Sequence, residues 1–400
     1  MTNSQAVSSG RKRPDLAGLS IALISGLGLA VAALFLCVVT FSGRVAGSRD
    51  FVSYWAAGRQ LVQHANPYDP VAIAQLEHAA GLDECALLVM RNTPWALPLA
   101  FPLGLLNERV AAIFWSLLLI ACLFVSIRMA WKMTGRPRSD LVWLGYCFPP
   151  ALFCVILGQT SVLLLFGLCL FLRFHRTSPF AAGAALWFCT LKPHLFLPFA
   201  LALLIWIVFT RAWKVLAGVL AAFAAGAAVT TAIDPLAWAQ YACYVRTSTM
   251  TREFTPYFGE LLRDRIDPAA EWLAFVPAIL GCAWALAYFW KRRRAWNWLE
   301  QGSLLMLVSL LVAPFGWIFD QSLAMPAILF ASSRARSRAV FPVLALIYLA
   351  FEIQLIYSKM YSPAYLWTAP AWLAWYLWAR AARGQEAVPA DIEAGANAGL

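Results

Sequence analysis

Long apolar runs alternate with short polar segments along almost the whole chain. A transmembrane helix needs roughly 20 apolar residues, so these runs predict helices that cross a bilayer. We place them at about 16–41, 110–131, 141–157, 162–174, 180–191, 195–210, 215–233, 271–290, 297–313, 322–331, 339–356 and 364–379. Some runs are short enough to be tilted or broken, and we therefore expect about 10 to 12 spans. The predicted fold class is all-α, a polytopic transmembrane helical bundle.

Two longer polar segments interrupt the runs, at 42–93 and 234–270. In the first segment, apolar residues recur at helical spacing near 51–64 and 71–80, which predicts two amphipathic helices separated by the Pro-containing turn 66–70. The next run, 94–106, contains three prolines, Pro94, Pro98 and Pro102. It is too short and too interrupted to span, so we expect a re-entrant or interfacial piece.

Lys and Arg residues gather in short clusters between the runs, as at 11–13 and 291–294. The positive-inside rule then places both termini in the cytoplasm and the two long segments outside. We expect a multi-pass protein of a bacterial-type inner (plasma) membrane. Residues 1–15 and 384–400 are predicted to be cytoplasmic tails, the second disordered, around a single membrane domain at 16–383.

Composition agrees with this topology. Of 400 residues, 62% are hydrophobic and 13% are charged, whereas soluble domains carry about a quarter charged residues. The net charge of +11 lies in the clusters between the runs, so it does not indicate a nucleic-acid partner. The chain contains no Gly-rich phosphate loop, the motif that would indicate a nucleotide-binding domain.

A few polar residues stand at the ends of apolar runs. They are Arg49, Asp50, Gln159, Lys192, His194 and Asp320. The predicted topology places all of them at the external side. Because polar groups at membrane depth are costly and usually line a cavity, we infer one polar pocket at the outer leaflet, roofed by the two external segments.

Each residue also has a purely structural interpretation. Asp50 and Arg49 could form a surface ion pair that caps the next helix. Lys192 could be a snorkelling anchor, Gln159 could cap a helical hairpin, and His194 alone favours neither interpretation. Asp320, flanked by Phe319 and followed by an apolar run, has the weakest structural explanation.

A pocket that holds carboxylates and cations and opens to both lipid and water suits a polyprenyl-phosphate sugar. The isoprenoid tail needs lipid, the phosphate needs a cation, and the sugar must meet an acceptor at the water side. We predict Asp50 as the base that deprotonates the acceptor hydroxyl, and a Lys or Arg side chain (Lys192, or else Arg49, Arg91 or Arg246) as the cation that stabilises the leaving phosphate. Tyr54 and other external aromatic residues could stack on sugars, although an interfacial aromatic belt explains them equally well.

Several of these residues occur in an order that resembles glycosyltransferase family 87. They are Arg49-Asp50-Phe51, Tyr54, Asn66-Pro67-Tyr68-Asp69, Gly158-Gln159, Leu191-Lys192-Pro193 and Phe319-Asp320. The resemblance covers roughly residues 45–331. That family includes polyprenol-phosphate-mannose-dependent mannosyltransferases.

The resemblance implies a GT-C fold. It also implies the transfer of a hexose, with mannose as the leading candidate, to a glycan or glycolipid acceptor on the external face, with inversion at the anomeric carbon. It implies Asp50 as the catalytic base. Donor-phosphate or substrate binding is expected of Arg49, Tyr54, Gln159, Lys192, His194 and Asp320. The chain departs from the family pattern at Thr160-Ser161 and at Gln321. These departures affect the inference of donor and acceptor more than the inference of the fold.

No cofactor is expected, and metal use is open: Asp50 and Asp320 could share a cation, although a monophosphate leaving group does not require one. Two other functions remain as alternatives. A secondary transporter would suit an even number of spans, but its polar residues should lie in mid-span and its halves should repeat. A non-catalytic polymer-export or assembly component would need no Asp50 pocket.

Overall fold

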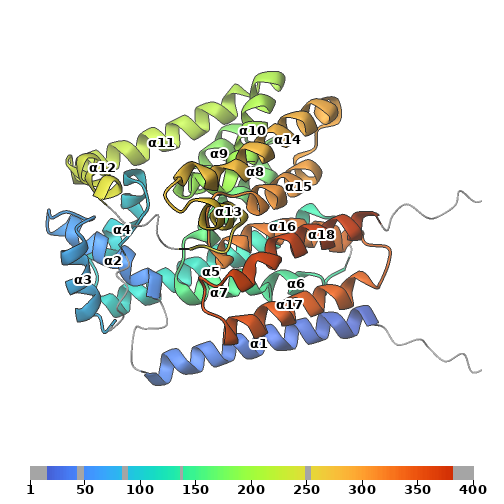
Figure 1. The fold of residues 1–400 in the computed structure, drawn as a ribbon, viewed down its shortest axis with the longest axis horizontal. Helices are drawn as coiled ribbons and strands as arrows, with labels where there is room; N and C mark the ends of the chain where they lie inside the picture. Colours follow the sequence, from blue (N-terminus) through green and yellow to red (C-terminus); the bar gives the residue numbers. More distant parts are fainter. Residues whose placement is uncertain (1–15, 43–48, 83–88, 136–137, 248–253, 382–400) are drawn as a thin grey trace, which may run out of the picture.

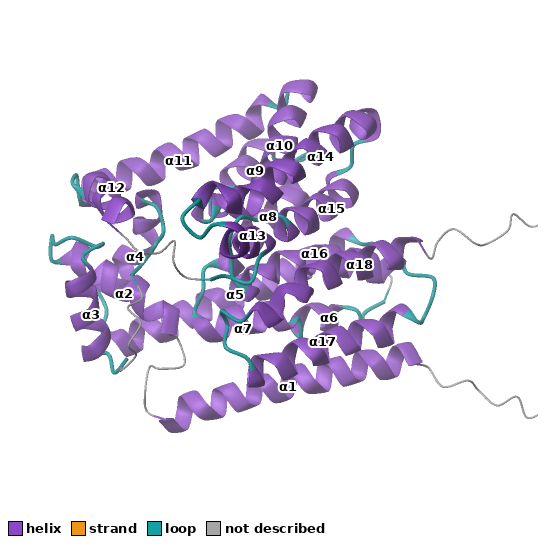
Figure 2. Cartoon of the chain, viewed as in Figure 1, coloured by secondary structure: helices purple, strands orange, loops and turns teal. Residues whose placement is uncertain are grey.

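The computed structural model describes residues 16–42, 49–82, 89–135, 138–247 and 254–381, without the side chains of residues 29 and 31–49. The predicted tails at 1–15 and 384–400 lie outside these residues. Throughout the described part the chain is helical and contains no strand, as Figure 2 shows. The all-α prediction is therefore confirmed.

The described residues of the first predicted external segment form the two helices that the sequence predicts. Helix α1 (Leu16–Ser42) leads to two short helices, α2 (Arg49–Val62) and α3 (Pro70–Ala79). Asp69 caps α3, because its Oδ1 accepts from the backbone N–H of Val71 at 2.9 Å. The proline-rich run forms only η2 (Pro94–Ala96) and α4 (Leu97–Gly104), neither long enough to span.

Within the described residues, five helical segments are long and apolar enough to cross a membrane: Glu108–Met133, Pro193–Thr210, Trp213–Ile233, Glu271–Ala295 and Val340–Tyr357. The predicted span at 141–157 is divided into α6 (Val142–Tyr146) and α7 (Pro149–Leu157). Pro149 and Pro150 open α7, and since proline lacks an N–H it cannot continue the preceding helix. The bundle therefore combines long helices with short and broken ones.

The remaining elements follow the predicted order. They are α5 (Glu108–Met133), α8 (Ser161–Phe174), α9 (Pro179–Ala185), η3 (Phe188–Leu191), η4 (Pro193–Phe196), α10 (Leu197–Thr210), α11 (Trp213–Ile233), α12 (Ala237–Thr247), α13 (Phe258–Ile266), η6 (Glu271–Phe275), α14 (Val276–Arg292), η7 (Arg293–Ala295), α15 (Trp298–Leu311), η8 (Ile318–Ala324), α16 (Met325–Arg334), α17 (Val340–Tyr357), η9 (Pro363–Trp367) and α18 (Thr368–Ala381).

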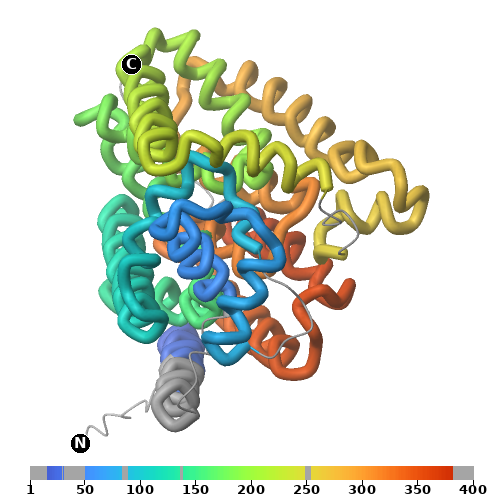
Figure 3. The backbone as a smooth tube through the Cα atoms, turned by 90° about the vertical axis from the view of Figure 1, so that its left-hand side faces the viewer, coloured from blue at the N-terminus to red at the C-terminus, as the bar shows by residue number. Residues whose placement is uncertain are grey.

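Helices α2, α3, α4 and α12 gather at one end of the molecule, at the left of Figure 1, whereas α1 begins and α18 ends at the opposite end. Figure 3 looks onto the first end and shows the α2–α3 segment, in blue, lying over the middle of the bundle. The two predicted external segments thus share one end, and the described chain begins and ends at the other.

Helix α2 is held at two points by backbone contact. A Cβ added to Gly58 would lie 2.0 Å from the carbonyl oxygen of Ala100 in α4. At the start of α2, Phe51 is fully buried against Gly158, where an added Cβ would lie 2.7 Å from the Phe51 Cβ. These contacts need glycine, and they fix the beginning of α2 against the turn between α7 and α8.

Candidate active site

A buried ion pair joins two distant parts of the chain. Lys192, between η3 and η4, places its Nζ 2.6 Å from Oδ1 of Asp320 in η8. The Asp320 side chain is 1% exposed and that of Lys192 is 13% exposed. The two residues are 128 positions apart, and the structure brings them together at the end of the bundle that carries α2. The predicted convergence of Lys192 and Asp320 is thus a feature of the structure.

Both carboxylate oxygens of Asp320 accept hydrogen bonds. Its Oδ2 accepts from the backbone N–H of Trp317 at 2.8 Å, within the first turn of η8. Its Oδ1 also accepts from the hydroxyl of Ser161, which opens α8. Together with Lys192, three donors thus converge on this carboxylate. Asp320 therefore provides a fixed negative charge that holds Lys192 in place.

Gln159 connects this ion pair to the first external segment. Its Oε1 accepts from Lys192 Nζ at 3.3 Å and from the hydroxyl of Tyr54 at 3.0 Å. Gly158 adopts a left-handed conformation, with φ of 71°, and its carbonyl accepts from Trp115 Nε1 at 2.7 Å. The turn that carries Gln159 is thereby fixed between α2 and α8.

Asp50 lies in the first turn of α2, one helical turn before Tyr54, and is half-buried. Burial raises the pKa of Tyr54 above its ordinary value of 10, and the negative charge of Asp50 raises that pKa further, with a smaller contribution from Asp320. Tyr54 is thus the side chain that lies within electrostatic range of both predicted acids. Its own ring is 6% exposed and packs beside Trp115, with ring centroids 5.7 Å apart.

His194 lies in η4, two residues after Lys192. Its ring packs against Phe315 with centroids 4.1 Å apart, and it is close enough to Lys192 and Asp320 for both charges to act on it. The backbone of Arg49 begins α2, but its side chain lies outside the described part. Of the predicted site residues, the hydrogen-bonded network unites Tyr54, Gln159, Lys192 and Asp320, and Asp50 and His194 lie within electrostatic range of its members.

Sequence reasoning missed two members of the site. Ser161 is fully buried and lies 3.1 Å from Lys192 Nζ through its Oγ. Phe319 presents its ring 4.8 Å from the same ammonium group. Thr160-Ser161 was interpreted only as a departure from the family pattern. The available signal was a small hydroxyl residue two positions after Gln159, at the start of a helix.

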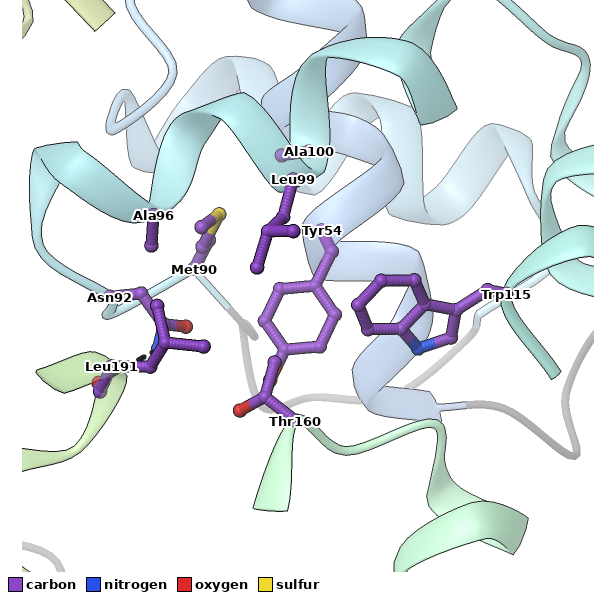
Figure 4. A pocket seen from close by; sticks show the side chains of 9 residues that line it. All are labelled: Tyr54, Met90, Asn92, Ala96, Leu99, Ala100, Trp115, Thr160 and Leu191. Carbon is purple, nitrogen blue, oxygen red and sulfur yellow. Dashed lines mark hydrogen bonds between the residues drawn. The ribbon is translucent and has the colours of Figure 1, made fainter. Parts of the chain in front are cut away.

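A small apolar cavity lies behind Tyr54 (Figure 4). Its lining residues come from α2, the stretch before η2, the proline-rich segment, α5, the turn before α8 and η3: Tyr54, Met90, Asn92, Ala96, Leu99, Ala100, Trp115, Thr160 and Leu191. Asn92 Nδ2 donates to the carbonyl of Leu191 at 3.1 Å. None of these described lining residues carries a charge.

The positive charge of Lys192 and the acids around it define the chemistry that the site can perform. Lys192 Nζ has three protons, which meet Asp320, Ser161 and Gln159 at 2.6, 3.1 and 3.3 Å. In the described part of the chain, no group of three or more His, Cys, Asp or Glu side chains could hold a metal ion. Asp320 is instead paired with Lys192.

Comparison with known families gives a match that contains the centre of this site. The sequence profile of glycosyltransferase family 87 matches residues 92–314 of the 400-residue chain. The matched region includes Gln159, Lys192 and His194, but not Asp50 or Asp320. No curated protein and no solved structure matches the chain.

Proposed function

Because the chain belongs to glycosyltransferase family 87, we propose that it transfers a hexose from a polyprenyl-phosphate donor to a glycan or glycolipid acceptor. Mannose is the leading candidate for this hexose. Family membership and the apolar helices make it a membrane glycosyltransferase. The same membership favours an enzyme over the transporter and the export component. The donor, the sugar and the mechanism are the parts that we propose.

The observation that carries the proposal is the position of Lys192. Its ammonium group is nearly buried, at the end of a membrane bundle, beside a helix that carries a second acid. A cation in a site of low polarity binds phosphate strongly. Of its three contacts, the one to Gln159 is the longest, at 3.3 Å, and is the contact that a donor phosphate would replace.

Asp50 is better suited than Asp320 to act as the base. Asp320 is buried and already accepts from Lys192, Ser161 and the Trp317 N–H. An acceptor hydroxyl would have to displace one of these donors to reach the Asp320 oxygens. Asp50 is half-buried at the start of α2, one helical turn before Tyr54, which donates to Gln159. An acceptor hydroxyl could reach it from the aqueous side.

In the proposed reaction, Asp50 takes the proton of the acceptor hydroxyl as that oxygen attacks the anomeric carbon of the donor sugar. The bond between this carbon and the phosphate oxygen breaks, and the phosphate leaves with the electron pair. Lys192 compensates the charge that develops on the leaving group. A single displacement of this kind inverts the anomeric configuration.

We place the reaction at the external face of a bacterial-type inner (plasma) membrane, with both termini in the cytoplasm. Basic clusters lie near the chain ends and at 291–294, and the site lies at the opposite end of the bundle. This sidedness follows the positive-inside rule.

The test is transfer of radiolabelled sugar from polyprenyl-phosphate mannose, and from other hexose donors, to membrane extracts by the purified protein. Asp50→Asn should reduce transfer by about 10²- to 10⁴-fold, the usual contribution of a general base. Glu108→Gln is a matched control, because Glu108 also lies in the first turn of a helix. It should retain wild-type activity.

Folding of both variants is checked by thermal unfolding in detergent. If folded Asp50→Asn keeps full activity, Asp50 is not the base. If the wild-type protein accepts no polyprenyl-phosphate sugar, the proposed donor class is wrong.

A further inference from the structure

Lys192 and His194 stand at the beginning of a row of aromatic and aliphatic side chains. The ring of His194 packs against Phe315, with centroids 4.1 Å apart, and Phe315 meets Phe275 edge-on at 6.2 Å. Phe315 is 36% exposed and Phe275 is 40% exposed. The row thus leads from the phosphate-binding cation to the outer surface of the bundle.

Phe275 is the last residue of η6 and directly precedes α14. Ile279 lies one helical turn further along, on the same side as Phe275, and is 64% exposed; the adjacent Leu280 is 66% exposed. These residues continue the row into the long apolar segment Glu271–Ala295. The row therefore joins a polar site to a surface that faces the bilayer.

We propose that Phe315, Phe275 and Ile279 form a binding track for the first isoprene units of the donor lipid. This inference rests on the proposed function, because it takes the donor to be a polyprenyl phosphate. The occupant is a flexible apolar chain with a phosphate at one end. Its phosphate meets Lys192, its chain lies along the track, and its sugar projects to the opposite side, toward Gln159 and Asp50.

The arrangement of charges supports this direction. Lys192 adjoins two different surroundings: its ammonium group lies 3.3 Å from Gln159, which also bonds to Tyr54, and His194, two residues further along the chain, packs against Phe315. A lipid-linked sugar is likewise polar on one side of its phosphate and apolar on the other. Binding in the reverse direction would place the apolar chain beside Asp50. The carboxylate would then lose contact with water, which costs free energy.

The experiment compares KM and kcat for two donors, a long-chain polyprenyl-phosphate mannose and a short analogue with about two isoprene units. Removing a ring that packs on the chain should raise KM by about 5- to 30-fold. Phe275→Ala should do so for the long donor only, because the short chain does not extend that far. Phe315→Ala should raise KM for both donors, and kcat should change little in either variant.

Tyr361→Ala is the matched control. Tyr361 is an exposed aromatic residue, 53% accessible, between α17 and η9, and α17 lies across the bundle from α14 (Figure 1). Its replacement should leave both KM values unchanged. All three variants are first compared with the wild-type protein by thermal unfolding.

A second measurement does not depend on catalysis. A photoreactive phenylalanine analogue at position 275 should capture radiolabelled polyprenyl phosphate well above the level captured at position 361. Equal capture at the two positions, or equal KM effects of Phe275→Ala and Tyr361→Ala, would mean an interfacial aromatic belt and would overturn the track. Absence of transfer from both donors by the wild-type protein would instead refute the donor class, and the track with it.

Discussion

At the scale of single residues, the ion pair of Lys192 and Asp320 combines structure and chemistry. Asp320 is 1% exposed as a side chain, and removing one partner of such a pair leaves an uncompensated buried charge, which typically costs about 3–5 kcal/mol. Lys192→Met and Asp320→Asn should each lower the stability of the protein by this amount. The double variant should recover most of the loss, since neither charge is then unpaired.

Activity should not recover with stability. The double variant lacks the cation that we assign to the donor phosphate, so transfer should stay as low as in Lys192→Met. Thermal unfolding and sugar transfer, measured on the same preparations, check both expectations. Arg334→Met is the control, because Arg334 and Glu300 form a more exposed pair at 2.8 Å, and such pairs contribute about 0–1 kcal/mol. A double variant that regains transfer would show that Lys192 has only a structural role.

At the scale of elements, the turn between α7 and α8 positions α2. Gly158 has a φ of 71°, and an added Cβ would meet the Cβ of Phe51 at 2.7 Å. Gly81 has a φ of 86° but no atom within 4 Å of an added Cβ. Gly158→Ala should therefore lose stability through both backbone strain and displacement of α2, whereas Gly81→Ala incurs the strain alone, about 1–2 kcal/mol.

Transfer activity separates the two variants further. Displacing α2 moves Asp50 and Tyr54 relative to Lys192, so Gly158→Ala should reduce kcat by about 10-fold or more, since small misplacements at a reacting centre are costly. Gly81→Ala should keep its kcat. Equal kcat values for the two variants would show that the Phe51–Gly158 contact does not position the site.

The elements also show how far the sequence could predict the structure. The apolar runs predicted the order of helices, the two amphipathic helices of the first segment and the broken run at 94–106. The division of 141–157 at Pro149 was not predicted, because a proline within an apolar run can kink a helix or end it. Only packing against neighbouring helices decides between these outcomes.

The candidate site was predictable to a similar extent. Topology alone placed Gln159, Lys192 and Asp320 at one end of the bundle, because polar groups at the ends of apolar runs are few. The contact of Ser161 with both charges could not be predicted, since it depends on how α8 and η8 pack. Nor did the sequence indicate that Tyr54 is buried and bonded to Gln159 rather than open to a sugar.

At the scale of the whole molecule, the arrangement predicts which side of the membrane each part faces. Cys243 is exposed on α12, at the end that carries the site. In intact cells, a variant with Cys85→Ser should react through Cys243 with a membrane-impermeant maleimide. In a background with serine at both 85 and 243, Arg293→Cys should react only after the membrane is permeabilised.

Loss of labelling in Cys85→Ser/Cys243→Ser is the control for specificity. The other cysteines with described side chains are buried, apart from the partly exposed Cys282 in the apolar helix α14. Labelling of Arg293→Cys in intact cells would reverse the proposed orientation and place the reaction in the cytoplasm.

The contact between Gly58 and Ala100 has a further consequence for how the enzyme works. An added Cβ on Gly104 would likewise lie 2.1 Å from the carbonyl carbon of Gly58, so α2 and α4 touch backbone to backbone and form one stiff unit. Asp50 cannot shift without carrying the proline-rich segment with it. With the proposed base on this unit, the cost in entropy of bringing the reactants together should fall mainly on the acceptor, which has to dock against it.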